Sequence, residues 1–319
     1  MSQSMAPIAQ ENKTFGIGLM IGAMLTMTAM DAIVKWAVAD YSLQQVNFIR
    51  SITAMLVLSP LLIKNGGFRA LYTTRPWVHV WRTLLMVTIS YTWFFALGRM
   101  KLADLGAILM VAPLIITALS VPLLGEKVGR RRWIAVSIGF AGMLAIVRPG
   151  MGIFNPIAVL AVTVAFGYAM LILSNRTNRD KESLASLTYY PLIGIFIVSG
   201  LLSLLDWTPP TPVAWSAMLF VGLCAGLGHL CLTLAFRYAS PPVLAPLEYT
   251  GLIWAVLFGY WFFDELPDQW TVLGMLMIAG AGIFVVYREA VMTTQLVPEP
   301  DSELGSDLHQ RVAKADLPS

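Results

Sequence analysis

Long apolar runs separated by short polar stretches dominate this chain. A helix needs about 20 mostly apolar residues to cross a bilayer, and ten runs come close to that length or exceed it. We expect helices at about 16–37, 44–63, 77–98, 102–124, 132–148, 155–174, 188–205, 213–237, 241–262 and 270–287. Short connections favour antiparallel packing of sequence neighbours. The pattern predicts an all-α, multi-pass membrane protein with ten transmembrane helices.

The composition agrees with membrane insertion. Hydrophobic residues make up 57% of the 319 residues and charged residues 12%, about half the charged fraction of soluble domains. The net charge of +3 is too small to indicate a nucleic-acid partner.

Residues 1–14 form a polar segment, and the first apolar run is too long for a signal-peptide core. Residues 291–319 carry prolines and acids and are expected to form a disordered tail.

The second half of the chain repeats the first at a fixed offset. Ala96–Glu126 aligns with Ala235–Glu265 without gaps, at an offset of 139. Each copy continues through a tryptophan into a glycine-rich apolar run that ends in arginine: Trp133 and Arg148, then Trp270 and Arg288. The repeat predicts two units, 15–148 and 155–288, with five spans each. An odd number of spans inverts the second unit in the membrane, an architecture typical of secondary transporters.

Loop charges predict the orientation. Fifteen Lys and Arg residues fall on one side if the N-terminus is cytoplasmic, against three on the other. Because positive residues accumulate in cytoplasmic loops, both termini are expected inside. The same assignment places Glu126 on the cytoplasmic side and Glu265 on the outer side. The outer positive residues are Arg99, Lys101 and Arg148.

Charged residues inside the predicted spans are candidates for function, because a charge in hydrocarbon costs a few kcal/mol or more. Asp31 and Lys35 lie four apart on the first span, hence on one face, and Arg50 of the second span is expected at similar depth. These three residues either line a substrate site or gate, or form a structural ion pair. Arg82 on the third span is expected to snorkel to the headgroups rather than to attract an anionic substrate.

The second half contributes His229 on the eighth span and Glu248 on the ninth. Both are expected at matching depth on neighbouring helices, and burial of a carboxylate and an imidazole at this depth suits reversible proton binding. The alternative for His229 is a hydrogen-bonded structural role. By the repeat alignment Glu248 falls opposite Leu109, so the two halves share a scaffold but differ in chemistry.

Aromatic residues lie near these charges, and four sit deep enough to stack on a planar or cationic ligand: Tyr91, Tyr168, Tyr249 and Trp254. Packing is the alternative for each. Pro113 and Pro246 are expected to kink the fourth and ninth spans.

Other classes of function find less support. Cys224 and Cys231 are read as small core side chains, with a metal site that includes His229 as a remote alternative. We expect no metal and no cofactor.

An intramembrane enzyme would need a nucleophile or metal constellation, which the sequence lacks. A channel would normally repeat one pore-lining ring in each unit, and the polar residues here are asymmetric.

Motifs in both halves of the chain resemble a known family. The run Phe94–Leu114, the Gly-Glu at 125–126 and the glycine-rich run from Gly139, together with Asp264–Glu265 and the run from Gly280, resemble the EamA repeat of the drug/metabolite transporter superfamily. The resemblance implies a ten-span carrier that works by alternating access on small organic solutes.

A second resemblance narrows the group. The stretches Asp31–Trp36 and Phe48–Arg50 resemble EamA-type carriers of S-adenosylmethionine and of riboflavin. We therefore expect a bacterial inner-membrane carrier of a vitamin, an S-adenosylmethionine-like or an amino-acid-like solute. Glu248, with His229, is expected either to couple transport to protons or to bind the substrate. The alternative is an efflux carrier for metabolites or toxic compounds. Substrate, direction and oligomeric state do not follow from the sequence.

Overall fold

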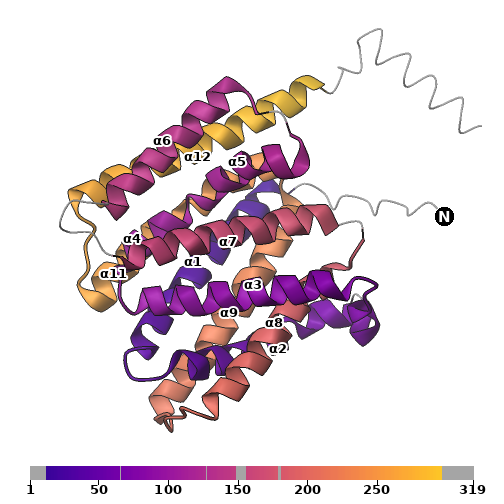
Figure 1. Ribbon diagram of the computed structural model, residues 1–319, viewed down its shortest axis with the longest axis vertical. Coiled ribbons are helices and arrows are strands. Elements are labelled where there is room, and N and C mark those ends of the chain that lie inside the picture. The colour runs from indigo at the N-terminus through magenta and orange to yellow at the C-terminus, as the bar shows by residue number, and fades with distance from the viewer. Residues whose placement is uncertain (1–11, 65, 127, 149–155, 179–180, 297–319) are drawn as a thin grey trace, which may run out of the picture.

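The structure is a computed structural model that describes residues 12–296 apart from 65, 127, 149–155 and 179–180. Every regular element in these ranges is helical. The elements are α1 (Lys13–Ala37), α2 (Leu43–Lys64), the 3₁₀ helix η1 (Gly67–Leu71), α3 (Pro76–Leu97), α4 (Leu102–Leu109), α5 (Ala112–Leu124), α6 (Arg130–Val147), α7 (Ile157–Asn178), α8 (Leu184–Ser203), α9 (Pro212–Tyr238), α10 (Pro241–Glu248), α11 (Thr250–Phe263) and α12 (Gln269–Leu296). Figure 1 shows them as one bundle.

Nine helices in the described part of the chain are long and apolar enough to cross a membrane. Two of the nine are the broken helices α4–α5 and α10–α11. The tenth expected run is α6, whose 18 residues begin with three arginines at 130–132. All ten predicted runs are therefore helical, and α6 differs by its charged first turn. Helix α12 continues to Leu296, beyond the expected start of the disordered tail.

Helices α4–α5 and α10–α11 break at corresponding positions. The first interruption lies at Met110 and Val111, and the second lies at Tyr249. Met110 and Tyr249 are 139 residues apart, which is the repeat offset. Pro113 stands in the first turn of α5 and Pro246 precedes the second break. Proline lacks the N–H that would continue a helix, so these residues explain the interruptions that the sequence predicted.

The repeat extends to backbone detail at the ends of these helices. Gly125 and Asp264 terminate α5 and α11 in the left-handed conformation, with φ of 69° and 54°. The next residue in each copy donates a backbone hydrogen bond back to the helix, from Glu126 to Ser120 at 3.3 Å and from Glu265 to Gly259 at 2.9 Å. Both ends are caps of the Schellman type, and again the offset is 139.

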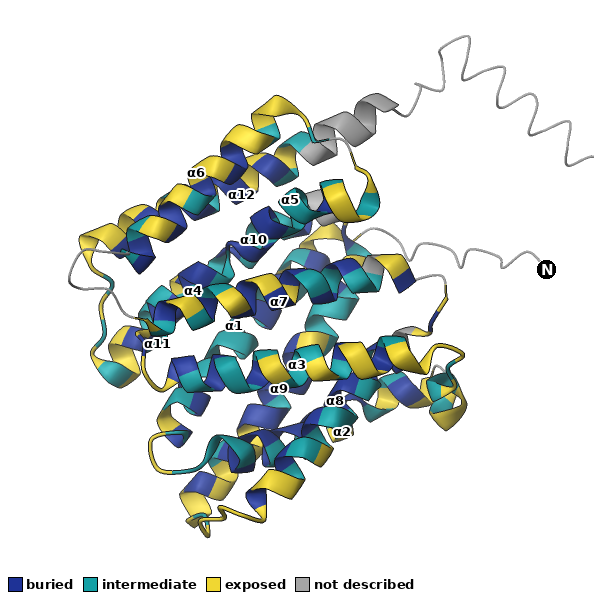
Figure 2. Ribbon diagram, in the orientation of Figure 1, coloured by how far each residue is buried: buried dark blue, intermediate teal, exposed yellow. Residues whose placement is uncertain are grey.

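The two halves also pack with matching neighbours. Helix α1 packs on α9 as α7 packs on α3, and α1 contacts α11 as α7 contacts α5. Helices α6 and α12, which correspond to each other, pack together at one edge of the bundle, as Figure 1 shows. Buried positions concentrate where the halves meet, and α4 is among the most enclosed elements in Figure 2. The two halves of the chain are therefore related in their packing, and their helices contact mainly each other.

Close helix approach occurs at glycines of α9. A Cβ added at Gly222 would lie 2.6 Å from the backbone oxygen of Arg50, and one at Gly226 would lie 2.6 Å from Val57. These small residues let α9 rest directly on α2 beside Arg50. The similar pair in α1, Gly18 and Gly22, has no atom within 4 Å of an added Cβ and serves no such contact.

Candidate functional site

Asp31 and Arg50 face the same interior region of the bundle from α1 and α2. The indole Nε1 of Trp93 on α3 donates a hydrogen bond to Oδ1 of Asp31 at 2.9 Å. Arg50 lies close enough to act electrostatically on Asp31, yet these two side chains do not reach ion-pair distance in the described structure. The cluster thus holds a basic and an acidic side chain that lie near each other but form no ion pair in the described structure.

Arg50 is held by neighbours on α3. Its side chain is only 6% exposed, and Nη2 donates to Oγ of Ser90 at 3.3 Å. The guanidinium also lies over the ring of Phe94, 5.2 Å from the ring centroid, a cation–π arrangement. Ser90 in turn donates to Oδ1 of Asn47 at 2.8 Å. Contacts between α2 and α3 therefore fix the charge of Arg50 inside the bundle.

His229 joins this cluster from α9. Arg50 acts electrostatically on the imidazole, so the two side chains lie in the same region. The side chain of His229 is not fully covered by other protein groups, although α9 packs on α1 and α2. The predicted proximity of His229 to Glu248 is not accompanied by a hydrogen bond between these residues in the described structure.

Glu248 forms a second polar group with two tyrosines. It is the last residue of α10, directly before the break at Tyr249, and it acts electrostatically on Tyr168 of α7 and on Tyr249. Tyr249 is 7% exposed, and its hydroxyl has no hydrogen-bond partner. Tyr168 keeps 38% of its surface accessible. A carboxylate at a helix break therefore lies near two aromatic side chains of the second half.

The remaining predicted aromatics serve different contacts. Tyr91 donates to Oγ of Ser199 at 3.1 Å and so links α3 to α8. Trp254 stacks on Phe258 at 6.4 Å between centroids, and its buried Nε1 has no partner. Of these two side chains, Trp254 is the one whose donor has no hydrogen-bond partner among the described residues.

Lys35 does not join the Asp31–Arg50 cluster, although its spacing placed it there. Its Nζ contacts both carboxylate oxygens of Glu265, at 2.6 and 2.9 Å, and the backbone oxygen of Met100 at 2.6 Å. Glu265 also accepts from the backbone N–H of Leu102 at 3.2 Å. The ammonium therefore joins the end of α1 to the start of α4 and to the α11–α12 loop.

Other positive residues of the first half contact the same loop, residues 264–268. Lys101 donates to the backbone oxygen of Leu266 at 2.9 Å, and Arg148 forms a bidentate pair with Asp268. The hydrogen bonds from Arg148 lower the pKa of Asp268 to about 2. Two of the three positive residues assigned to outer loops therefore bind this loop of the opposite half.

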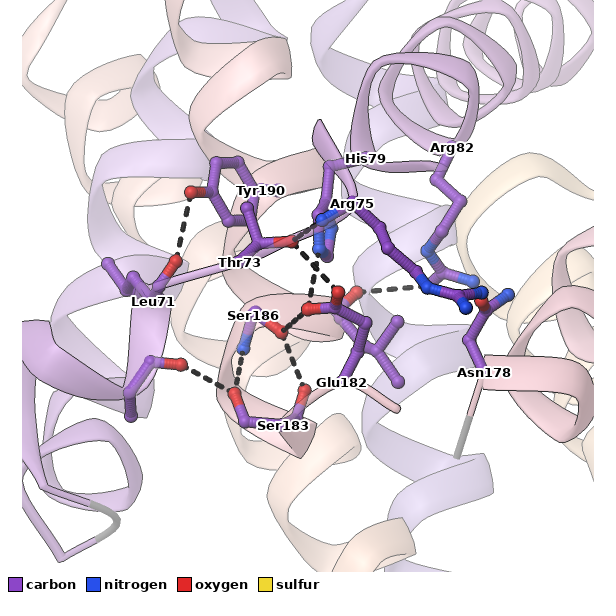
Figure 3. A network of polar contacts seen from close by, with 12 residues as sticks. Leu71, Thr73, Arg75, His79, Arg82, Asn178, Glu182, Ser183, Ser186 and Tyr190 are labelled. Atoms are coloured by element: carbon purple, nitrogen blue, oxygen red, sulfur yellow. Dashed lines mark hydrogen bonds and ion pairs between the residues drawn. The ribbon is translucent and has the colours of Figure 1, made fainter. Parts of the chain in front are cut away.

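A buried polar network, which the sequence analysis missed, joins the two halves elsewhere (Figure 3). Nε2 of His79 on α3 lies 3.1 Å from Oε2 of Glu182, which precedes α8, and both side chains are 2% exposed. Thr73 donates to Oε1 of the same carboxylate at 2.9 Å. The ring of Tyr190 stacks on His79 at 4.3 Å. The network ties the segment before α3 to the segment before α8.

Arg82 lies beside this network, and its position contradicts the predicted contact with lipid headgroups. Snorkelling to the headgroups is wrong for this residue, because its side chain is 2% exposed. Its guanidinium donates to the backbone oxygens of Leu187 at 3.0 Å and Leu171 at 3.4 Å. Backbone oxygens of α7 and α8 therefore accept the hydrogen bonds that we expected Arg82 to donate to lipid headgroups.

The His79–Glu182 contact predicts a pH-dependent stability. Burial alone would raise the pKa of Glu182, but hydrogen bonds from His79 and Thr73 outweigh burial and hold the pKa below its ordinary value. A lowered folded-state pKa stabilises the protein above about pH 4.3, and the stabilisation is lost as the pH falls through the lowered value. We expect Glu182→Gln to cost about 2 kcal/mol at pH 7, visible as a melting temperature lower by a few degrees in detergent.

The matched control is Asp206→Asn, because Asp206 is exposed and accepts a hydrogen bond from Gln44. This control should melt within about a degree of the wild type. The difference between Glu182→Gln and the wild type should shrink at pH 4. Equal melting temperatures at pH 7 would contradict a stabilising role for the carboxylate.

An apolar groove lies outside the polar clusters, between α1, α9 and α11. Its lining residues include Ile33, Trp36, Phe220 and Phe263. The lining contains none of the charged residues described above, and its composition is that of a surface that faces lipid.

The fold and these interior polar groups define a membrane carrier built from two repeats. Residues 14–148 and 155–288 both match the EamA-like transporter family. The chain belongs to this family, and it is a multi-pass transporter of the bacterial inner membrane. Family and relatives alike point to transport rather than to catalysis.

Several curated relatives cover nearly the whole chain. The S-adenosylmethionine uptake transporter of Rickettsia bellii is 28% identical over 281 residues, which is 88% of this chain and 96% of that protein. The riboflavin transporter of Rhizobium johnstonii is 26% identical over 295 residues, 91% of this chain and 96% of that protein. The pseudopaline exporter of Pseudomonas aeruginosa is 26% identical over 273 residues, 84% of this chain and 94% of that protein.

A solved crystal structure has the same fold. It aligns with a TM-score of 0.60 at 15% identity, covering 89% of this chain and 99% of the solved chain. At this identity the likeness speaks for the fold alone.

Proposed function

We propose that the protein is a ten-span carrier that moves a small organic metabolite by alternating access, with both termini in the cytoplasm. The units 15–148 and 155–288 would lie inverted relative to each other, with α6 and α12 as their fifth spans. The equal offset of the helix breaks and caps supports this arrangement. The fifteen-to-three bias of the loop charges supports the orientation.

The substrate site in this proposal lies between the halves at Asp31, Arg50, His229 and Glu248. The observation that carries it is the meeting of Asp31 and Arg50 inside the bundle without an ion pair. Buried charges are normally paired, so an unjoined pair is suited to bind a ligand that carries complementary groups. Tyr168, Tyr249 and Trp254 would stack on a planar portion of the solute, whereas Tyr91 and Lys35 would support the fold.

The substrate class that fits best is a metabolite with charged and planar parts. An S-adenosylmethionine-like solute has both, and a riboflavin-like vitamin offers the planar part alone. The relatives include importers and an exporter, so uptake is the proposal and efflux is the second candidate. Glu248 would couple transport to protons, because it lies at a helix break near two tyrosines.

Reconstitution into proteoliposomes tests this proposal. S-adenosylmethionine, riboflavin and a mixture of amino acids would be screened by thermal shift on the purified protein, and each hit would then be tested for uptake. Preloading with the unlabelled hit should accelerate entry of the labelled hit, because a carrier returns faster when loaded. Uptake without such counterflow would favour a channel, and the absence of uptake or efflux for every hit would contradict the proposal.

A further inference from the structure

A chain of polar contacts on α2 and α3 is arranged around one serine. Ser90 donates to Oδ1 of Asn47 at 2.8 Å and accepts from Nη2 of Arg50 at 3.3 Å. Asn47 and Arg50 lie three residues apart on α2, hence on one face. Both side chains are therefore fixed to the same oxygen atom, and their remaining donor groups lie in one small region.

Two of those remaining donors have no partner. Nδ2 of Asn47 and Nε of Arg50 are buried and make no hydrogen bond in the described structure. Asn47 is 0% exposed and Arg50 is 6% exposed. Buried polar groups are nearly always hydrogen-bonded, and leaving one unsatisfied costs about 1–3 kcal/mol. Two orphaned donors at one place indicate that an acceptor occupies this region at another stage of the transport cycle.

The chemistry of the donors selects the acceptor. A guanidinium and an amide, both presenting N–H groups, suit the two oxygens of a carboxylate. The balance of charge selects a singly charged group, because Arg50 is the positive residue that acts on Asp31 in the described part of the chain. Asp31, held through Oδ1 by Trp93, is free to accept from a cationic group of the same ligand. A solute with a carboxylate and an amine would join the two charges that the protein keeps apart.

We propose that Asn47, Ser90 and Arg50 form a carboxylate-binding subsite, and that Asp31 binds the amine of the same solute. This inference rests on the proposed carrier function and names the substrate class as a zwitterion with an amino-acid moiety. Asn47 and Arg50 bind the carboxylate directly. Ser90 is a positioning residue that holds both donors at a fixed separation.

Binding to purified protein in detergent tests the subsite with two matched pairs of probes. The pairs are S-adenosylmethionine with its decarboxylated form, and L-tryptophan with tryptamine. Each pair differs only by the carboxylate. In at least one pair the wild type should bind the zwitterion with a half-saturating concentration about tenfold lower than that of the amine.

Asn47→Asp tests the donor directly, because it keeps the oxygen that accepts from Ser90 and replaces the orphaned N–H by a second oxygen. It should erase the preference for the zwitterion. Ser90→Ala should reduce the preference about threefold or more by loosening both donors, and it decides the matter if Asn47→Asp does not fold. The matched control is Ser51→Ala, because Ser51 is also buried on α2 and, among the described residues, its hydroxyl bonds to the backbone of its own helix. This control should keep the full preference.

Two results would overturn the subsite. One is equal binding of both members of each pair by the wild type, and the other is an unchanged preference in Asn47→Asp. Binding of riboflavin alone, which carries no carboxylate, would also count against the subsite. Counterflow of riboflavin in proteoliposomes would then leave the proposed carrier function intact. Failure of counterflow with every solute would instead remove the carrier function on which the subsite rests.

Discussion

Replacing Glu248 by Gln should reduce proton-driven uptake about tenfold or more and remove its dependence on the proton gradient. Glu248 ends α10 at the helix break and lies near Tyr168 of α7 and Tyr249 at the break, so it faces a second element of its own half. A carboxylate in this position can bind and release a proton as the halves move, whereas a carboxamide of the same shape cannot. The measurement is initial uptake of a screened solute into proteoliposomes with and without an inward proton gradient.

The control for this experiment is Asp40→Asn, because Asp40 is exposed in the turn after α1. It removes the same kind of charge without touching the break, and it should leave uptake within about twofold of the wild type. Unchanged uptake and unchanged pH dependence in Glu248→Gln would exclude Glu248 as the coupling residue. Loss of uptake with retained pH dependence would instead assign it to substrate binding.

Replacing Lys35 by Met should destabilise the protein by about 2 kcal/mol or more, because Glu265 would keep a partly buried charge without its partner. The two side chains are 10% and 24% exposed, so solvent screens the pair only in part. Lys35 also donates to Met100, and this bond would be lost as well. The melting temperature in detergent should fall by several degrees.

The double variant Lys35→Met/Glu265→Met separates a structural role for Lys35 from a role in the substrate site. Removing both charges leaves no unpaired ion, so the double variant should recover most of the stability lost by the single variant. Its uptake should also return to within a few-fold of the wild type. Recovered stability without recovered uptake would show that Lys35 contacts the solute, contrary to the geometry.

The sequence predicted the helices and the repeat because both depend on local patterns. Apolar runs of sufficient length form helices wherever the membrane supplies no other hydrogen-bond partner. The offset of 139 then reappears in the breaks at Met110 and Tyr249 and in the caps at Gly125 and Asp264. Similar sequences at these positions form similar turns, so the correspondence required no knowledge of tertiary packing.

Side-chain partners could not be predicted in the same way. Lys35 shares a helix face with Asp31, but its partner Glu265 lies 230 residues away in the sequence. Arg82 finds backbone oxygens on α7 and α8, which no residue pattern reveals. Asn47 and Ser90 are uncharged and common in membrane helices, so only their contacts with Arg50 mark them as candidates. Positions that depend on packing between halves require the structure.

The central claim is that two related units lie inverted in the membrane, and cysteine accessibility at the two corresponding turns tests it most directly. Glu126→Cys and Leu266→Cys, each in a background with Cys224 and Cys231 replaced by Ala, place one thiol after α5 and one after α11. Both positions are exposed. In intact cells a membrane-impermeant maleimide should label Leu266→Cys and should label Glu126→Cys only after the membrane is opened. Labelling of both thiols from the same side would contradict the inverted arrangement and the carrier built on it.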